Sequence, residues 1–222
     1  MVVIHRVSGL TNAAFVEEHA RAGRVGLVGG ASLIDRAIAL AQRPLARGAG
    51  KSAWSHAFLF QGRRADGRHW VIESDLDVHR KHVRLGVQEN RADKYADEAA
   101  WPSIAILDFG LTAREVERVH ALALELVATR VRYSVRELLG TLVALHRPNA
   151  SGARAKANPL AREHAIFCSA FVQHVFRECG VDLVPGVDVK HTAPEDLARS
   201  PRAKTMWLRT ERRPDRERAQ RR

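Results

Sequence analysis

The sequence predicts one domain that combines β-strands with amphipathic α-helices and presents a cysteine at the start of one helix. Three observations favour it. Residues 166–176 read as the first turns of an apolar helix, residues 54–74 read as a β-hairpin, and residues 112–127 have apolar side chains at helical spacing. The chain has 222 residues, of which 45% are hydrophobic, enough to build one core and to exclude wholesale disorder.

Cys168 opens the predicted helix, which continues with apolar residues and ends at Gly180, a residue suited to helix exit. The first N–H groups of a helix have no partner within it and carry partial positive charge. Such an environment favours a thiolate, which is the nucleophilic form of cysteine. Cys179 lies deep in the same helix and is expected to be a small core residue.

The hairpin is predicted from strands at residues 54–61 and 69–74, with turn residues between them that end in Asp66-Gly67. If Gln61 faces Arg68, His56 pairs with Glu73, and opposed residues project to the same side of the sheet. Three apolar side chains on that side are expected to bury the stems of this pair: Phe58, Phe60 and Val71.

Other elements follow from local signals along the chain. Ser32 begins a predicted helix that Pro44 ends, and the capping boxes at Thr112 and Ser134 open two more helices. Strands are expected at residues 23–30 and 103–109, a short helix with Pro194 near its start at residues 192–197, a mobile basic loop at residues 146–163, and only a weak strand at residues 82–85 within residues 76–100.

The chain is strongly basic, with 36 Lys and Arg against 25 Asp and Glu, a net charge of +11. Part of this charge lies in residues 209–222, which we expect to be a disordered basic tail after a domain spanning residues 1–208. Such a balance favours anionic partners or substrates. No familiar nucleic-acid motif is present, so nucleic acid is not the expected partner, although a non-catalytic basic module that binds nucleic acid or an anionic surface is the competing interpretation.

The two cysteines lie roughly 16 Å apart along the predicted helix and cannot form a disulfide with each other. Free cysteines fit a reducing compartment. The sequence has no apolar run as long as a membrane span and no signal-peptide pattern at its start. We therefore expect a cytoplasmic protein as synthesised, with export by a signal-peptide-independent route as the alternative.

Cys168, His56 and Glu73 supply the three groups that a thiol hydrolase needs: a nucleophile, a proton carrier and a group that orients the carrier. The backbone N–H of Cys168 is the expected oxyanion donor. Glu163 and His164 are rivals for the base because they precede the cysteine closely. No cofactor or metal is expected, since structural zinc needs four N or S ligands and the histidines lack paired ligand spacing.

The order of these parts resembles the circularly permuted NlpC-like, papain-like amidase family of the YiiX/YaeF type. The similarity rests on His56 in residues 54–60, Glu73 in residues 71–74 and Cys168 in residues 167–172. In this family the cysteine helix follows the histidine hairpin, as it does here. Two further segments look similar, Arg132-Tyr133-Ser134 and residues 192–200, whereas Gly23-Arg24 stands where the family often has Gly-Asp.

The resemblance implies an α+β, papain-like fold with a small antiparallel sheet packed against the cysteine-bearing helix. It also implies an acyl-enzyme on Cys168, with His56 as base and Glu73 as the third member. The expected activity is hydrolysis of an amide such as a cell-wall peptide. Acyl-lipid hydrolysis or acyl transfer on the same residues is the alternative, and an anionic substrate suits the basic chain.

Overall fold

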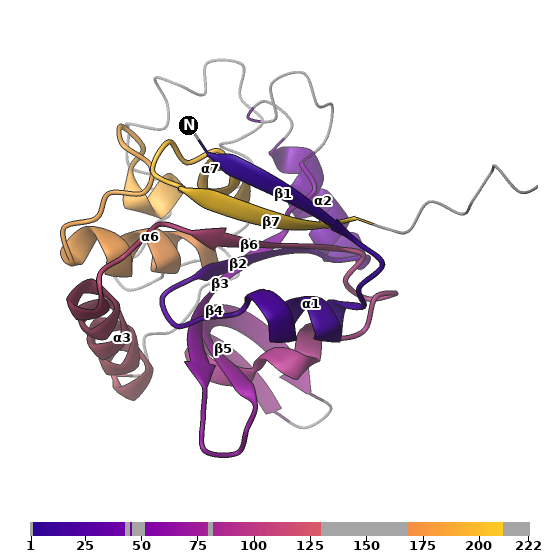
Figure 1. The fold of residues 1–222 in the computed structure, drawn as a ribbon, viewed down its shortest axis with the longest axis horizontal. Helices are drawn as coiled ribbons and strands as arrows, with labels where there is room; N and C mark the ends of the chain where they lie inside the picture. The colour runs from indigo at the N-terminus through magenta and orange to yellow at the C-terminus, as the bar shows by residue number, and fades with distance from the viewer. Residues whose placement is uncertain (1, 43–44, 46–51, 80–81, 130–167, 211–222) are drawn as a thin grey trace, which may run out of the picture.

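The computed structural model describes residues 2–42, 45, 52–79, 82–129 and 168–210. Its centre is a twisted β-sheet with helices on both faces (Figure 1). The architecture is therefore α+β. The small antiparallel sheet expected from the sequence is instead a sheet of seven strands in the described part of the chain, and one of its strand pairs is parallel.

The strands follow the order β1-β7-β6-β2-β3-β4-β5 across the sheet, and all neighbours except the parallel pair β1 and β7 are antiparallel. Their bounds are β1 Val3–Ser8, β2 Val25–Gly29, β3 His56–Arg63, β4 His69–His79, β5 His82–Arg91, β6 Ser103–Asp108 and β7 Thr205–Thr210.

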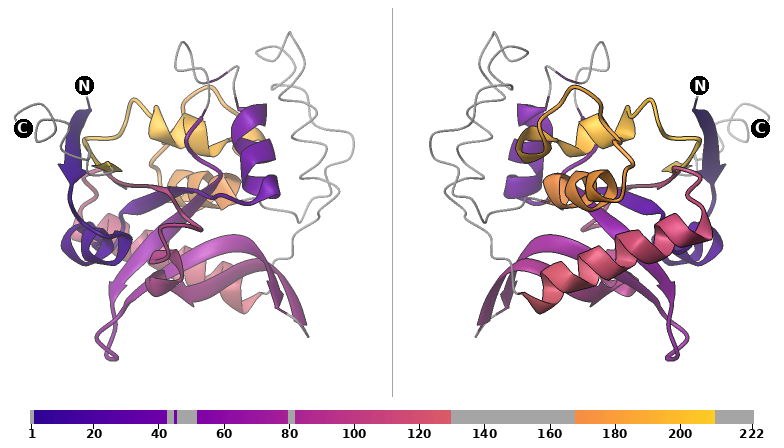
Figure 2. Two further views of the ribbon diagram at one scale, coloured as in Figure 1. Left: turned by 90° about the vertical axis from the view of Figure 1, so that its right-hand side faces the viewer. Right: turned by 90° about the vertical axis from the view of Figure 1, so that its left-hand side faces the viewer.

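Helices cover the two faces of the sheet as two separate layers (Figure 2). On one face α3 and α6 pack against Leu59 and Ile72, and on the other face α1 packs against Phe58 and Phe60. Successive strand residues thus serve opposite layers. The bounds are α1 Asn12–His19, α2 Leu33–Ala41, η2 Ala92–Tyr95, α3 Ala113–Ala128, α6 Cys168–Glu178, η3 Val189–His191 and α7 Pro194–Ala198.

Capping residues set the helix starts where the sequence predicted them. The Ser32 hydroxyl accepts from the Asp35 N–H at the start of α2, and Thr112 and Glu115 form the predicted capping box of α3. Gly180 has a φ of 88° and follows the cysteine helix as expected. The second predicted capping box, at Ser134, and the loop 146–163 lie outside the described residues.

The hairpin of β3 and β4 is confirmed, but its predicted register is wrong by two residues. Leu59 pairs with Ile72 and Phe60 with Val71, and a bulge follows between Phe60 and Gly62. Continued to the start of β3, this register places His56 level with Asp75, two residues beyond Glu73. A shift of two keeps every side chain on its face, so His56 and Glu73 still project to the same side.

The sheet extends further than the sequence indicated: β4 continues past the predicted end at residue 74 to His79, and β7 was not predicted as a strand. β5 continues from His82 to Arg91, well beyond the weak strand predicted at residues 82–85. β7 ends at Thr210, so Arg209 and Thr210 belong to the sheet and the folded domain extends past the expected boundary at residue 208.

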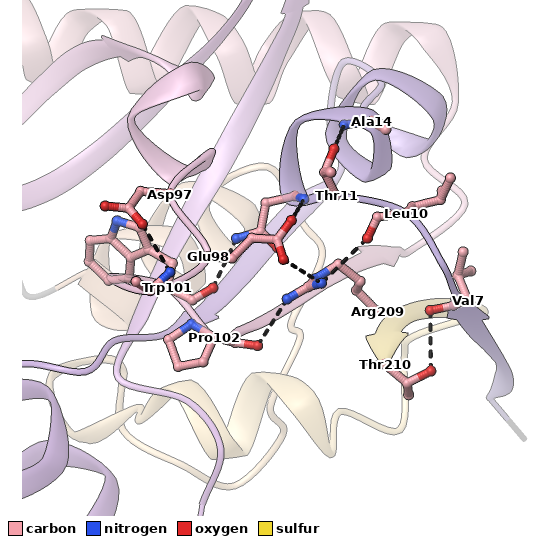
Figure 3. Close-up of polar contacts among 12 residues, drawn as sticks. Val7, Leu10, Thr11, Ala14, Asp97, Glu98, Trp101, Pro102, Arg209 and Thr210 are labelled. Atoms are coloured by element: carbon pink, nitrogen blue, oxygen red, sulfur yellow. Dashed lines mark hydrogen bonds and ion pairs between the residues drawn. The ribbon is translucent and has the colours of Figure 1, made fainter. Parts of the chain in front are cut away.

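Arg209 is buried beneath the loop that precedes β6 (Figure 3). Its guanidinium donates to the backbone oxygens of Leu10 and Pro102 and to the carboxylate of Glu98 at 3.3–3.4 Å. The last strand is thereby tied to both the N-terminal segment and the centre of the chain. In the part of the chain that the structure describes, no helix combines the length and apolarity needed to span a bilayer.

Candidate active site

Cys168 is the first residue of α6, and the packing of that helix fixes its position. Phe171, Val172, Val175 and Phe176 are fully buried against the sheet. The hydroxyl of Ser169 donates to the carbonyl of Thr192 at 2.6 Å, which ties the first turn to the segment before α7. Cys168 is itself buried and not disulfide-bonded.

His56 is the first residue of β3 and lies at the strand end that α6 reaches. Its Nε2 is 2.8 Å from Oε2 of Glu73, and its ring also hydrogen-bonds the side chain of Cys168. Burial by itself lowers the pKa of His56, but Cys168, Glu73 and Asp75 outweigh that effect and raise the pKa well above the ordinary value. The imidazole is therefore held in its protonated form between a sulfur and a carboxylate.

Glu73 lies on β4 and is fully buried, yet it has four hydrogen-bond donors around its two oxygens. Oε2 accepts from His56 and from the hydroxyl of Tyr95, while Oε1 accepts from Asn90 Nδ2 and Lys94 Nζ, both at 2.7 Å. Burial alone raises the pKa of this carboxyl, but the bonds from His56 and Lys94 reverse the effect and hold it well below its usual range. Glu73 is thus ionised throughout the physiological range.

The sequence prediction did not include three of these donors. Asn90 comes from the end of β5, and Lys94 and Tyr95 come from η2, the 3₁₀ turn that follows. Tyr95 is buried with its ring stacked on Phe58 at 4.4 Å, and burial with the nearby carboxylates raises the pKa of its hydroxyl. Residues 76–100 show no clear periodicity, so the one available signal was a tyrosine embedded in a charged stretch.

Residues that could hold a cation lie in the same cluster. The ligand atoms of His56, Glu73 and Asp75 lie within 4.8 Å of one another, a metal-compatible grouping among the described residues. Lys94 already contacts two of the three residues, with Nζ 2.7 Å from Oε1 of Glu73 and 2.8 Å from Oδ2 of Asp75.

The other sequence-predicted residues fall elsewhere. The rival bases Glu163 and His164 lie outside the described residues. Arg24, which stands where the resembling family often has an acid, pairs with Asp108 at 2.9 Å and lies over the ring of Trp207. It therefore joins β2 to β6 and β7 and takes no part in the cluster around Cys168.

No family model matches the chain, and no curated protein matches it. Among solved structures it is similar to the crystal structure of metalloprotein yiiX from Escherichia coli O157:H7, DUF1105. That structure aligns with a TM-score of 0.53 and 12% identity over 87% of this chain and 98% of its own. The similarity supports the YiiX-type resemblance at the level of the fold.

Proposed function

We propose that this protein is a papain-like thiol hydrolase that cleaves an amide through an acyl-enzyme on Cys168. The observation that carries the proposal is the placement of the His56 ring, which bonds Cys168 on one side and the buried carboxylate of Glu73 on the other. Acyl transfer requires a nucleophile that contacts a proton carrier, and a proton carrier that contacts an orienting acid. Cys168, His56 and Glu73 contact one another in that order.

The reaction follows from these contacts. The Cys168 thiolate attacks the carbonyl carbon, a C–S bond forms, and the carbonyl oxygen takes the negative charge beside the first N–H groups of α6. His56 then gives its proton to the leaving nitrogen as the C–N bond breaks, which leaves a thioester and a neutral imidazole. The imidazole next removes a proton from water, whose oxygen attacks the thioester. The acid product leaves as the C–S bond breaks, and the thiolate and imidazolium are restored.

Glu73 holds the charge and orientation of His56 through this cycle. Its lowered pKa keeps it negative, and its bond to Nε2 leaves the other ring nitrogen for the sulfur. A buried carboxylate that is ionised and fixed by four donors orients the imidazole at little entropic cost. The basic character of the chain suits an anionic amide such as an acidic cell-wall peptide.

The metal implied by the name of the yiiX structure does not fit the residues present here. His56, Glu73 and Asp75 have suitable atoms, but the ammonium of Lys94 lies within hydrogen-bond distance of both carboxylates. Two unit charges 4 Å apart repel by about 4 kcal/mol at an effective dielectric constant of 20, and a divalent ion doubles this value. The proposed reaction therefore includes no metal step.

Alkylation by iodoacetamide near neutral pH, followed by peptide mapping, tests the proposal. Cys179 does not lie deep in the helix as expected, because α6 ends one residue before it, at Glu178. It serves as an internal control because it is buried and has a pKa raised by that burial. We expect Cys168 to react at least about tenfold faster than Cys179. We also expect His56→Ala to slow Cys168 alone. Equal rates for the two cysteines, or no effect of His56→Ala, would contradict a thiolate–imidazolium pair.

An acyl-lipid substrate on the same residues is the second candidate, and the surface of α2 favours it. Leu33, Ile34 and Leu40 are 84%, 58% and 42% exposed, an unusual concentration of large apolar side chains on a nine-residue helix. The helix lies close to the site because the Ser55 hydroxyl, next to His56, donates to Asp35. Mass spectrometry of the Cys168 adduct, after incubation with cell-wall fragments or with a lipid panel, separates the two substrate classes.

A further inference from the structure

Lys94 is a second cation of the candidate site beside His56, and its side chain is 29% exposed. Its Nζ bridges Oε1 of Glu73 at 2.7 Å and Oδ2 of Asp75 at 2.8 Å, and it lies 5.1 Å from the centre of the Tyr95 ring. Burial lowers the pKa of a lysine, but the two carboxylates reverse this and raise the pKa of Lys94 above its ordinary value. The side chain is therefore a permanent ammonium.

Lys94 offsets part of the negative charge in this cluster. Glu73 and Asp75 contribute two negative charges, and the imidazolium of His56 offsets one of them. Without Lys94, His56 and two carboxylates with ligand atoms within 4.8 Å would resemble a three-ligand divalent-cation site. The ammonium supplies a positive charge at the position where such a cation would contact the carboxylates.

We propose that Lys94 is a positioning residue that takes the place of a metal ion: it offsets one negative charge of the Glu73–Asp75 pair, excludes divalent cations from it, and fixes Glu73 for its bond to His56. This role deepens the proposed hydrolase function and rests on it for the catalytic consequence alone. The exclusion of metal stands or fails independently of any hydrolytic activity.

Manganese binding, followed by electron paramagnetic resonance, tests the exclusion. Mn²⁺ prefers carboxylate and imidazole ligands over thiolate, so Cys168 does not compete for it. We expect wild-type protein and the control variant Lys190→Met, which removes an exposed lysine from η3, to show no binding in this cluster. We expect Lys94→Met to bind one Mn²⁺ at least roughly 10- to 100-fold more tightly than the weakest binding that the measurement would detect in wild type, and Glu73→Gln in that background to abolish the site.

The positioning role has a separate readout in the alkylation rate of Cys168. Lys94→Met should slow alkylation, whereas Lys94→Arg, which keeps the charge, should retain most of the rate and still exclude Mn²⁺. The proposal would be overturned if wild-type protein bound one Mn²⁺ and Glu73→Gln abolished that binding. This outcome requires no Lys94 variant. If Lys94→Met gains Mn²⁺ while Cys168 is unreactive in every form, the cation role holds and the hydrolase proposal fails.

Discussion

Glu73 is the residue on which the electrostatics of the candidate site depend. It is fully buried and ionised, and it contacts two positively charged side chains, His56 and Lys94. Removal of one partner from such a pair leaves an uncompensated charge in the interior, which costs far more than the net value of the pair.

Glu73→Gln keeps the shape of the side chain and removes its charge. We expect the free energy of unfolding to fall by about 3 kcal/mol and the turnover of an amide substrate to fall roughly 100-fold or more. Urea denaturation and a steady-state assay measure the two effects. Glu89→Gln on the neighbouring strand β5 is the matched control, because its partner Arg64 is exposed and such pairs contribute at most about 1 kcal/mol. Equal losses in both variants would show that Glu73 has no special role.

The raised pKa of His56 determines how the free energy of unfolding should depend on pH. Its folded-state pKa is raised, so its contribution to stability is complete below the unfolded value near 6.5 and is lost as pH rises through the folded pKa. The wild type should therefore lose up to about 1.4 kcal/mol per pH unit above pH 6.5, relative to His56→Gln, in urea denaturation.

His120 supplies the control of opposite sign. Burial lowers its pKa, and its ring contacts the backbone oxygen of Phe60. Comparison of wild type with His120→Gln should show no loss of stability above pH 6.5, because the folded ring is already neutral and the unfolded ring gives up its remaining proton within about one pH unit. A flat difference for His56→Gln over the same range would mean that the imidazole is not held in its charged form.

At the scale of elements, the site depends on how closely β2 approaches β3. Gly26 lies opposite Phe58, and a Cβ at position 26 would be 2.1 Å from the Phe58 ring. That ring stacks on Tyr95, whose hydroxyl donates to Glu73. A change in the spacing between β2 and β3 would therefore move the Phe58 ring, the Tyr95 ring and, through the Tyr95 hydroxyl, the carboxylate of Glu73.

Gly26→Ala should displace Phe58 and disturb Tyr95. We expect a loss of about 1–3 kcal/mol of stability, the usual cost of overpacking, together with slower alkylation of Cys168. Thermal unfolding and alkylation measure both. Addition of Phe58→Leu should recover part of each loss, because the smaller side chain makes room for the new methyl group. Strictly additive effects of the two substitutions would argue against this route of transmission.

Elements with strong local signals were predicted from the sequence, and those defined by distant contacts were not. The capping residues Ser32 and Thr112 act within a few residues of themselves, so they marked their helices correctly. Lys94 contacts Glu73 only because β5 returns beside β4, which no local pattern in residues 76–100 reveals. The hairpin register was missed by two because the turn was misplaced: Arg63 pairs with His69, where Gln61 was expected to face Arg68, and local turn residues do not fix where the strands first pair.

At the scale of the whole molecule, the first and the last strand of the described residues lie side by side in the sheet. β1 and β7 form its one parallel pair in the described residues, and Arg209 connects β7 to the segments around Leu10 and Pro102. Composition alone does not predict this strand, because Arg209 adjoins an arginine-rich stretch that is typical of a disordered tail. Its side chain is only 4% exposed, so it serves the fold and not the basic surface.

Two truncations test where the domain ends. Deletion of residues 211–222 removes only the remaining part of the predicted tail, so the unfolding free energy and the reactivity of Cys168 should be unchanged. Deletion of residues 209–222 also removes Arg209 and its bonds to Leu10, Glu98 and Pro102, and should cost about 2–4 kcal/mol in urea denaturation. Arg209→Met in the full chain separates loss of the guanidinium from loss of the strand end. If the two truncated proteins were equally stable, the folded domain would end at residue 208, as the sequence predicted.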